Sequence, residues 1–205
     1  MPLVVALDGP AGSGKSSVSR AVATKLGIGY LDTGAMYRAA TWWVLHRGID
    51  PADAAGVADA VRDFELRIGT DPERPQVAVA GQDVTAAIRE PDVTANVSAV
   101  SAVPAVRAEM VARQRVAAAE CAHRTGGVIV EGRDIGTTVL PDAPLKIFLT
   151  ADAEARAARR HLEDRGAGRA SGELDRTLAA LRARDAAEAG RTESPMQRAD
   201  DAVAV

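Results

Sequence analysis

The chain has 205 residues, of which 47% are hydrophobic and 26% charged, and its formal net charge is −3. These values are typical of one folded domain, or of one domain with a modest insertion, and they argue against both a disordered chain and two large domains. The small negative charge also argues against general binding to nucleic acid or to an anionic membrane, which requires a basic surplus.

Cysteine and histidine are rare. The single Cys121 excludes an internal disulfide, and the three histidines (His46, His123, His161) show no zinc-binding spacing. The N-terminal sequence lacks the basic region and the long apolar run of a signal peptide, and no later stretch approaches about 18 uninterrupted apolar residues. We therefore expect a cytoplasmic protein that does not span a membrane.

The first part of the chain alternates strand and helix patterns. Residues 3–7 form a short apolar run typical of a buried parallel strand, and residues 16–26 follow with helical spacing and a stop at Gly27. Residues 30–31 predict a second strand, residues 35–46 a second helix that ends before Gly48, and Pro51 the first turn of a third helix. Such alternation indicates a parallel sheet.

The pattern changes after residue 63. Residues 64–68 alternate apolar and polar, and residues 77–79 and 81–82 follow a proline-containing turn, which is typical of an antiparallel hairpin. One or two short helices are expected next, because Pro91 and Pro104 interrupt the helical stretches. We interpret residues 64–103 as a small inserted module of antiparallel strands and helices, followed by a long helix over residues 106–124.

The strand and helix alternation then resumes. Residues 127–130 and 145–149 predict two more buried strands, residues 153–162 and 172–188 two helices, and residues 202–205 a last strand. The chain stops where this strand would end, so we expect a closing helix to be absent from the sequence as given. The predicted core comprises residues 1–63 and 104–205, with a helical lid at about residues 156–171.

A phosphate-binding motif lies between the first strand and the first helix. Residues 9–16, GPAGSGKS, satisfy G-x-x-x-x-G-K-[ST] in the strand-to-helix context that the P-loop requires. Its backbone N–H groups and the following helix terminus would surround phosphate oxygens, Lys15 would reach the β- and γ-phosphates, and the Ser16 hydroxyl would ligate Mg²⁺. The predicted ATP-binding residues are Gly9, Pro10, Ala11, Gly12, Ser13, Gly14, Lys15, Ser16 and Ser17. The expected fold is therefore a P-loop α/β protein, a doubly wound parallel sheet flanked by helices.

A P-loop alone leaves several functions open, including hydrolytic switches and small-molecule kinases. A guanine-nucleotide switch would carry [NT]-K-x-D, but Asn96 is the only asparagine and no such motif occurs. A kinase of a phosphorylated acceptor needs a second anion site and a cationic lid. Arg38, in the first turns of the second helix, is a candidate for the acceptor phosphate, and residues 131–134 follow a buried strand at the edge of the sheet where α/β folds bind ligands.

Five motifs together resemble the bacterial cytidylate kinases over essentially the whole chain. They are GPAGSGKS at 9–16, LDTGAMYR at 31–38, EGRDIGT at 131–137, PDAPLKIFL at 141–149 and RD-x-x-E-x-x-R-x-x-SP at 184–195. The insertion also matches the monophosphate-binding module of that family. The resemblance implies Mg²⁺-dependent transfer of the γ-phosphoryl group of ATP to CMP or dCMP.

The resemblance also implies roles for individual residues. Asp134, Arg107 and Ser98 would contact cytosine; Arg38, Arg133 and Arg191 the acceptor phosphate; and Arg184 and Glu188 the ribose, with Thr33 also in the CMP site. The family usually has aspartate where Glu188 stands. Among the lid arginines Arg156, Arg159 and Arg160, the first and last are assigned with Lys15 and Arg133 to catalysis. Asp32 and Asp185 are interpreted as orienting or structural carboxylates.

Two alternatives remain at this point. A kinase of another small acceptor is favoured if Asp134 and Arg107 do not contact the base, and a P-loop hydrolase or switch would act on nucleotide without an acceptor. The expected partners are ATP and CMP or dCMP, with no nucleic acid and no membrane, and the expected assembly is a monomer.

Overall fold

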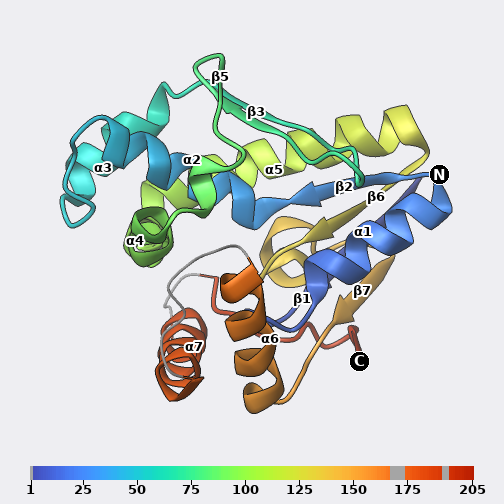
Figure 1. Ribbon diagram of the computed structural model, residues 1–205. Coiled ribbons are helices and arrows are strands. Elements are labelled where there is room, and N and C mark those ends of the chain that lie inside the picture. Colours follow the sequence, from blue (N-terminus) through green and yellow to red (C-terminus); the bar gives the residue numbers. More distant parts are fainter. Residues whose placement is uncertain (1, 167–173, 191–193) are drawn as a thin grey trace.

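A parallel five-stranded sheet forms the centre of the computed structural model, which describes residues 2–166, 174–190 and 194–205 (Figure 1). The strand order is β2-β6-β1-β7-β8, and every neighbouring pair is parallel. The strands are β1 (Leu3–Asp8), β2 (Gly29–Asp32), β6 (Gly127–Glu131), β7 (Leu145–Phe148) and β8 (Val203–Ala204). All five predicted strands are thus confirmed.

Helices cover both faces of this sheet because successive side chains of a buried strand point to opposite sides. Val5, Leu7 and Ile129 pack with Ala23 of α1, whereas Ala6 and Val130 point to the other face and join a cluster with residues of α2 and α5. The predicted doubly wound arrangement is confirmed. The helices are α1 (Lys15–Leu26), α2 (Thr33–His46), α3 (Ala54–Arg62), α4 (Pro91–Ala102), α5 (Pro104–Thr125), α6 (Ala153–Gly166) and α7 (Leu174–Ala189).

Prolines mark helix beginnings here, but one of them was interpreted wrongly. Pro91 and Pro104 stand at the first position of α4 and α5, where the missing N–H is not needed. Pro51 does not begin a helix: it lies in a turn, and α3 begins at Ala54 because the Asp53 carboxylate accepts a hydrogen bond from the Gly56 N–H. The N-cap carboxylate, and not the proline, sets this boundary.

The segment after residue 63 contains the predicted antiparallel strands. They are β3 (Leu66–Ile68), β4 (Val77–Val79) and β5 (Gln82–Asp83), in the order β3-β4-β5, followed by the short 3₁₀ helix η1 (Ala87–Arg89). Phe64, Val79 and Ile88 belong to the same buried cluster as Met110 of α5 and Ala39 of α2. Strands β3 and β4 therefore pack directly on α2, and the small sheet shares a buried cluster with α5, while the division into a core and a 64–103 module stays a prediction.

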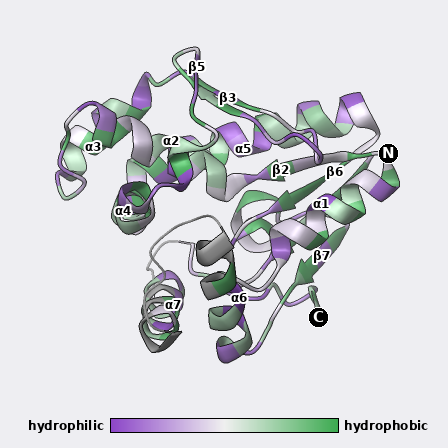
Figure 2. Ribbon diagram, viewed as in Figure 1, coloured by the Kyte–Doolittle hydropathy of each residue, from purple (hydrophilic) through white to green (hydrophobic). Residues whose placement is uncertain are grey.

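The carboxyl ends of β1, β2 and β6 meet at one edge of the sheet, and each is followed by polar loop residues. Figure 2 shows the contrast between the hydrophobic strands and the hydrophilic residues of the loops beyond them. After β6 the chain forms a short π-helix, η2 (Ile135–Val139). The predicted lid begins within α6, which packs against α7, and its residues 167–171 lie outside the described part. Within the described ranges, none of the helices has the length and apolar character needed to cross a membrane.

Candidate active site

The P-loop has the backbone geometry that its glycines permit. Gly9, Gly12 and Gly14 all have positive φ angles, and Gly14 stands immediately before the first residue of α1. A Cβ atom on Gly9 would lie only 2.1 Å from the backbone oxygen of Leu149, so the loop runs directly against the chain that follows β7. This close approach fixes the loop at the edge of the sheet, with the N-terminal end of α1 behind it.

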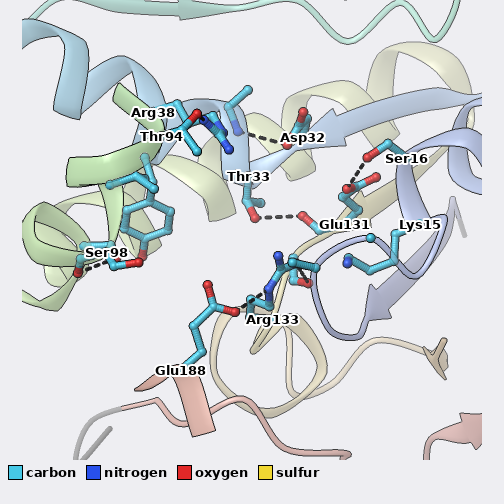
Figure 3. Close-up of a pocket in the computed structure, with 18 of the residues that line it drawn as sticks. Lys15, Ser16, Asp32, Thr33, Arg38, Thr94, Ser98, Glu131, Arg133 and Glu188 are labelled. Atoms are coloured by element: carbon cyan, nitrogen blue, oxygen red, sulfur yellow. Dashed lines mark hydrogen bonds and ion pairs between the residues drawn. The ribbon is translucent and has the colours of Figure 1, made fainter. Parts of the chain in front are cut away.

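Lys15 is held inside the P-loop. Its Nζ donates a hydrogen bond to the backbone oxygen of Pro10 at 2.7 Å, and the residue is only 4% exposed. Burial, together with the nearby Arg133 guanidinium, lowers the pKa of Lys15 from 10.5 to about 7. Figure 3 shows Lys15 and Arg133 extending toward the same space. A polyanion bound between Lys15 and Arg133 would offset the repulsion between their positive charges.

Glu131, at the end of β6, joins the P-loop to β2. One of its carboxylate oxygens accepts a hydrogen bond from Ser16 Oγ at 2.7 Å (Figure 3), and the other accepts one from Tyr30 OH at 2.8 Å. Its backbone oxygen accepts a third, from Thr33 Oγ1 at 2.7 Å. Burial and the neighbouring Asp32 carboxylate raise the pKa of Glu131. The sequence analysis gives this residue no role, although its place directly after a buried strand beside the P-loop strand is a usable signal.

Arg107 and Asp134 form a buried ion pair on another wall. Arg107 Nη2 donates to Asp134 Oδ2 at 2.5 Å, and the Arg107 guanidinium carbon lies 5.8 Å from the centre of the Tyr37 ring. Arg107 Nε is buried without a hydrogen-bond partner among the described residues. Because a buried donor without a partner costs free energy, it is a position where an acceptor on a ligand would be stabilising. Ser98 and Ser101 of α4 line the same cavity.

Two further arginines predicted to bind phosphate line the cavity, each with a fixed partner. Arg38 Nη1 donates to Thr94 Oγ1 at 2.8 Å, and Arg133 Nε donates to Glu188 Oε2 at 2.7 Å. Glu188 comes from α7, so this ion pair ties the C-terminal helix to the loop after β6. Arg191 lies outside the described residues, and so does the side chain of Arg184.

The lid arginines contact the P-loop backbone. Arg156 is buried, and its Nη1 donates both to the backbone oxygen of Ala11 at 3.0 Å and to Asp185 Oδ2 at 2.6 Å. Arg159 Nη1 donates to the backbone oxygen of Ser13 at 3.2 Å. The side chain of Arg160 lies outside the described part. Asp185 is thus an orienting partner of Arg156, and Asp32 caps α2 by accepting from the Ala35 N–H at 2.9 Å.

All of these walls enclose one cavity of about 830 Å³. It brings together most of the predicted residues: Ala11, Gly12, Gly14, Lys15, Ser16, Ser17, Thr33, Arg38, Ser98, Arg107, Arg133, Asp134 and Glu188. Gly9, Pro10 and Ser13 belong to the loop but do not line it, and neither do Arg156 and Arg159. Residues without a predicted site role also line it: Tyr37, Arg89, Thr94, Ser101, Glu131, Thr177 and Leu181. One volume therefore has a P-loop on one wall and the Arg107–Asp134 pair on another.

A family model and curated relatives with similar sequences carry the same name. The model of the family described as cytidylate kinase matches residues 5–205. A protein named cytidylate kinase from Streptomyces griseus subsp. griseus is 55% identical over 203 residues, which are 99% of this chain and 84% of that protein. One of the same name from Corynebacterium glutamicum is 56% identical over 200 residues, 98% of this chain and 85% of that one.

Proposed function

The chain belongs to the cytidylate kinase family, and on that premise we propose that it transfers the γ-phosphoryl group of ATP to CMP or dCMP, giving ADP and CDP or dCDP. The observation that carries this proposal is the single cavity with the P-loop on one wall and the buried Arg107–Asp134 pair on another. A kinase of a phosphorylated acceptor needs a second substrate site that faces the P-loop, and this wall can supply it.

The donor side is formed by the P-loop and the beginning of α1. Backbone N–H groups of the loop and the positive end of the helix favour the phosphates of ATP. Lys15 can exchange its hydrogen bond to Pro10 for the β- and γ-phosphate oxygens, which would restore a fully protonated ammonium group. Arg133, which faces the same space, supplies a second positive charge beside the transferring group.

Ser16 and Glu131 fit the requirements of Mg²⁺. The Ser16 hydroxyl and a Glu131 carboxylate oxygen lie 2.7 Å apart, which places two hard oxygen donors together beside the P-loop. The described part of the chain contains no cluster of three His, Cys, Asp or Glu residues, which agrees with a cation held chiefly by phosphates and water. When bound, Mg²⁺ would neutralise charge on the β- and γ-phosphates.

The Arg107–Asp134 pair supports selection of cytosine. Asp134 can accept a hydrogen bond from the N4 amino group, and Arg107 and Ser98 can donate to the ring acceptors. Uracil presents an oxygen where cytosine has its amino group, so it would face the buried Asp134 carboxylate with a second acceptor. CMP is therefore favoured over UMP, because UMP would leave the Asp134 carboxylate without a hydrogen-bond donor.

The acceptor phosphate would lie between Arg38 and Arg133, whose guanidinium groups suit phosphate oxygens. Its oxygen is already anionic, so transfer requires alignment and charge neutralisation and no general base. Arg191 would add a third cation, and Arg184 with Glu188 would contact the ribose. Arg156 and Arg160, on the lid, would neutralise charge on the transferring phosphoryl group; these roles rest on the resemblance. We also propose that the protein acts in pyrimidine nucleotide metabolism in the cytoplasm, because both substrates are metabolites of that compartment, and that it is a monomer.

A coupled assay of ADP release tests the proposal. The wild-type protein with ATP and Mg²⁺ is measured without acceptor and then with CMP, dCMP, UMP, AMP or shikimate. We expect strong stimulation by CMP and dCMP alone, and a loss of about 100-fold in the preference for CMP over UMP in Asp134→Asn. Asp142→Asn, an exposed site outside the cavity, is the matched control. ADP release independent of acceptor, or stimulation by another acceptor only, would overturn the assignment.

A further inference from the structure

Asp8 is a buried carboxylate that lines no wall of the cavity. It is the last residue of β1, immediately before the P-loop, and it is only 5% exposed. Its two oxygens accept hydrogen bonds from the backbone N–H groups of Ile135, at 2.9 Å, and Gly136, at 2.8 Å. A carboxylate removed from water is costly unless each oxygen is satisfied, so these two hydrogen bonds account for its presence in the interior.

The two N–H groups belong to the first residues of η2, the π-helix that directly follows Asp134. The initial N–H groups of a helix have no partner within it, and the residue before the helix commonly accepts from them with its own side chain. Asp134 occupies that preceding position, but its side chain makes no capping hydrogen bond. Asp8 accepts these N–H groups in its place, and the Asp134 carboxylate turns toward Arg107 at the cavity.

We call Asp8, together with the Ile135 and Gly136 N–H groups, the clamp. Side chains pack closely around it. A Cβ atom on Gly136 would lie 3.2 Å from Lys146 Cδ and 3.5 Å from Asp8 Oδ2. Lys146 is in turn held by Asp201, with Nζ 2.8 Å from Oδ2. The charged groups that face Asp8 are Asp134, which raises its pKa, Arg133, which lowers it, and Lys15 of the P-loop. Burial is the largest cause and raises the pKa of Asp8 to about 6.

We propose that Asp8 is a positioning residue for base selection: by capping η2 in place of Asp134, it leaves the Asp134 carboxylate available to cytosine and holds that carboxylate at a fixed place relative to the P-loop. This inference rests on the proposed function, because it assigns to Asp134 the reading of the base. It adds a residue outside the cavity that controls selectivity through two peptide groups.

The test is Asp8→Asn, which keeps the size of the side chain but replaces one acceptor with an NH₂ group that would face a peptide N–H. Without the clamp, the Asp134 side chain can accept the N–H groups of η2 and leave the base. We expect KM for CMP to rise about tenfold, the preference for CMP over UMP to fall about tenfold, and KM for ATP to change less than about twofold. Asp142→Asn, at an exposed aspartate outside the clamp, is the matched control.

A double-mutant cycle with Asp134→Asn separates positioning from a general structural role. If Asp8 acts through Asp134, adding Asp8→Asn to the Asp134→Asn protein should change kcat/KM for CMP by less than about twofold. Additive losses, or equal increases in KM for CMP and ATP, would overturn the inference.

Two further outcomes are distinguishable. Should Asp8→Asn fail to fold, Asp8→Ser retains one oxygen acceptor without the buried charge and should show the same loss of selectivity; unchanged selectivity would overturn the inference. A wild-type protein that shows no CMP-dependent ADP release would overturn the proposed function and this inference together, whereas a CMP-selective wild type with a CMP-selective Asp8→Asn overturns the inference alone.

Discussion

Replacing Lys15 with methionine should abolish turnover and stabilise the fold at the same time. Lys15 is buried, and its pKa is lowered from 10.5 to about 7 by burial and by Arg133. Below pH 7 the side chain is charged in both the folded and the unfolded chain, so the cost of burying the charge is fully present. Between pH 7 and 10.5 the folded chain is neutral at this position while the unfolded chain is charged, and the cost shrinks as the pH rises.

The size of the effect follows from the pKa values. At 1.36 kcal/mol per pKa unit, the difference between 10.5 and about 7 corresponds to a burial cost of about 5 kcal/mol below pH 7 and of about 2 kcal/mol at pH 9. Methionine removes this cost but also removes the hydrogen bond from Nζ to the Pro10 oxygen, which contributes about 1–2 kcal/mol. The Lys15→Met protein should therefore gain about 3 kcal/mol at pH 6 and almost nothing at pH 9.

Urea unfolding of the wild type and of Lys15→Met at both pH values measures the difference directly. Lys25→Met, at an exposed position near the end of α1, is the control and should change the free energy of unfolding little at either pH. The ADP-release rate of Lys15→Met should fall at least about 100-fold, because the charge opposite the transferring phosphoryl group is lost. If Lys15→Met lowers the free energy of unfolding equally at pH 6 and pH 9, the burial of the Lys15 ammonium does not destabilise the fold and the reasoning is refuted.

Two other substitutions test contacts that lie behind the cavity and hold its walls in place. Tyr30→Phe removes the hydrogen bond to Glu131 Oε2, so Glu131 becomes a poorer anion beside Ser16. When the rate is titrated with Mg²⁺, the concentration that gives half the maximal rate should rise about three- to tenfold, while KM for CMP stays constant. A raised KM for CMP with an unchanged Mg²⁺ requirement would contradict the placing of Mg²⁺ here. Gly9→Ala places a Cβ 2.1 Å from the Leu149 oxygen at a φ of 147°, and thermal unfolding should show a loss of at least about 3 kcal/mol. Gly81→Ala, at a φ of 78° with open space around it, is the control at about 1 kcal/mol, and equal losses at the two glycines would contradict the steric argument.

The sequence predicted the fold well where a local pattern determines it. The apolar run before GPAGSGKS, the glycine stop after α1 and the alternation at residues 64–68 each depend on neighbouring residues, and each corresponds to an element of the structure. Pro51 was interpreted wrongly because the competing N-cap, Asp53, lies only two residues away. Where two helix-start patterns lie this close together, the capping hydrogen bond that actually forms decides the boundary.

The candidate site was predicted through its motifs and not through its contacts. Lys15, Arg38 and Asp134 were found because each stands at a strand end or in the first turns of a helix. The hydrogen bonds of Glu131 to Ser16 and Tyr30 join side chains 115 and 101 residues apart, and those of Asp8 reach 127 and 128 residues along the chain. The order and register of the strands bring these partners together, and neither can be read from the sequence alone.

The strand order also bears on how the chain reaches its native state during synthesis. Strand β1 occupies the middle of the sheet, and both of its neighbours, β6 and β7, begin more than 100 residues later in the chain. Contacts this distant in sequence slow folding, because the loop between them must be closed before any pairing is rewarded. β1 therefore cannot pair with β6 before residue 131 has been translated, nor with β7 before residue 148, and a shorter ribosome-bound chain is exposed to aggregation through this strand.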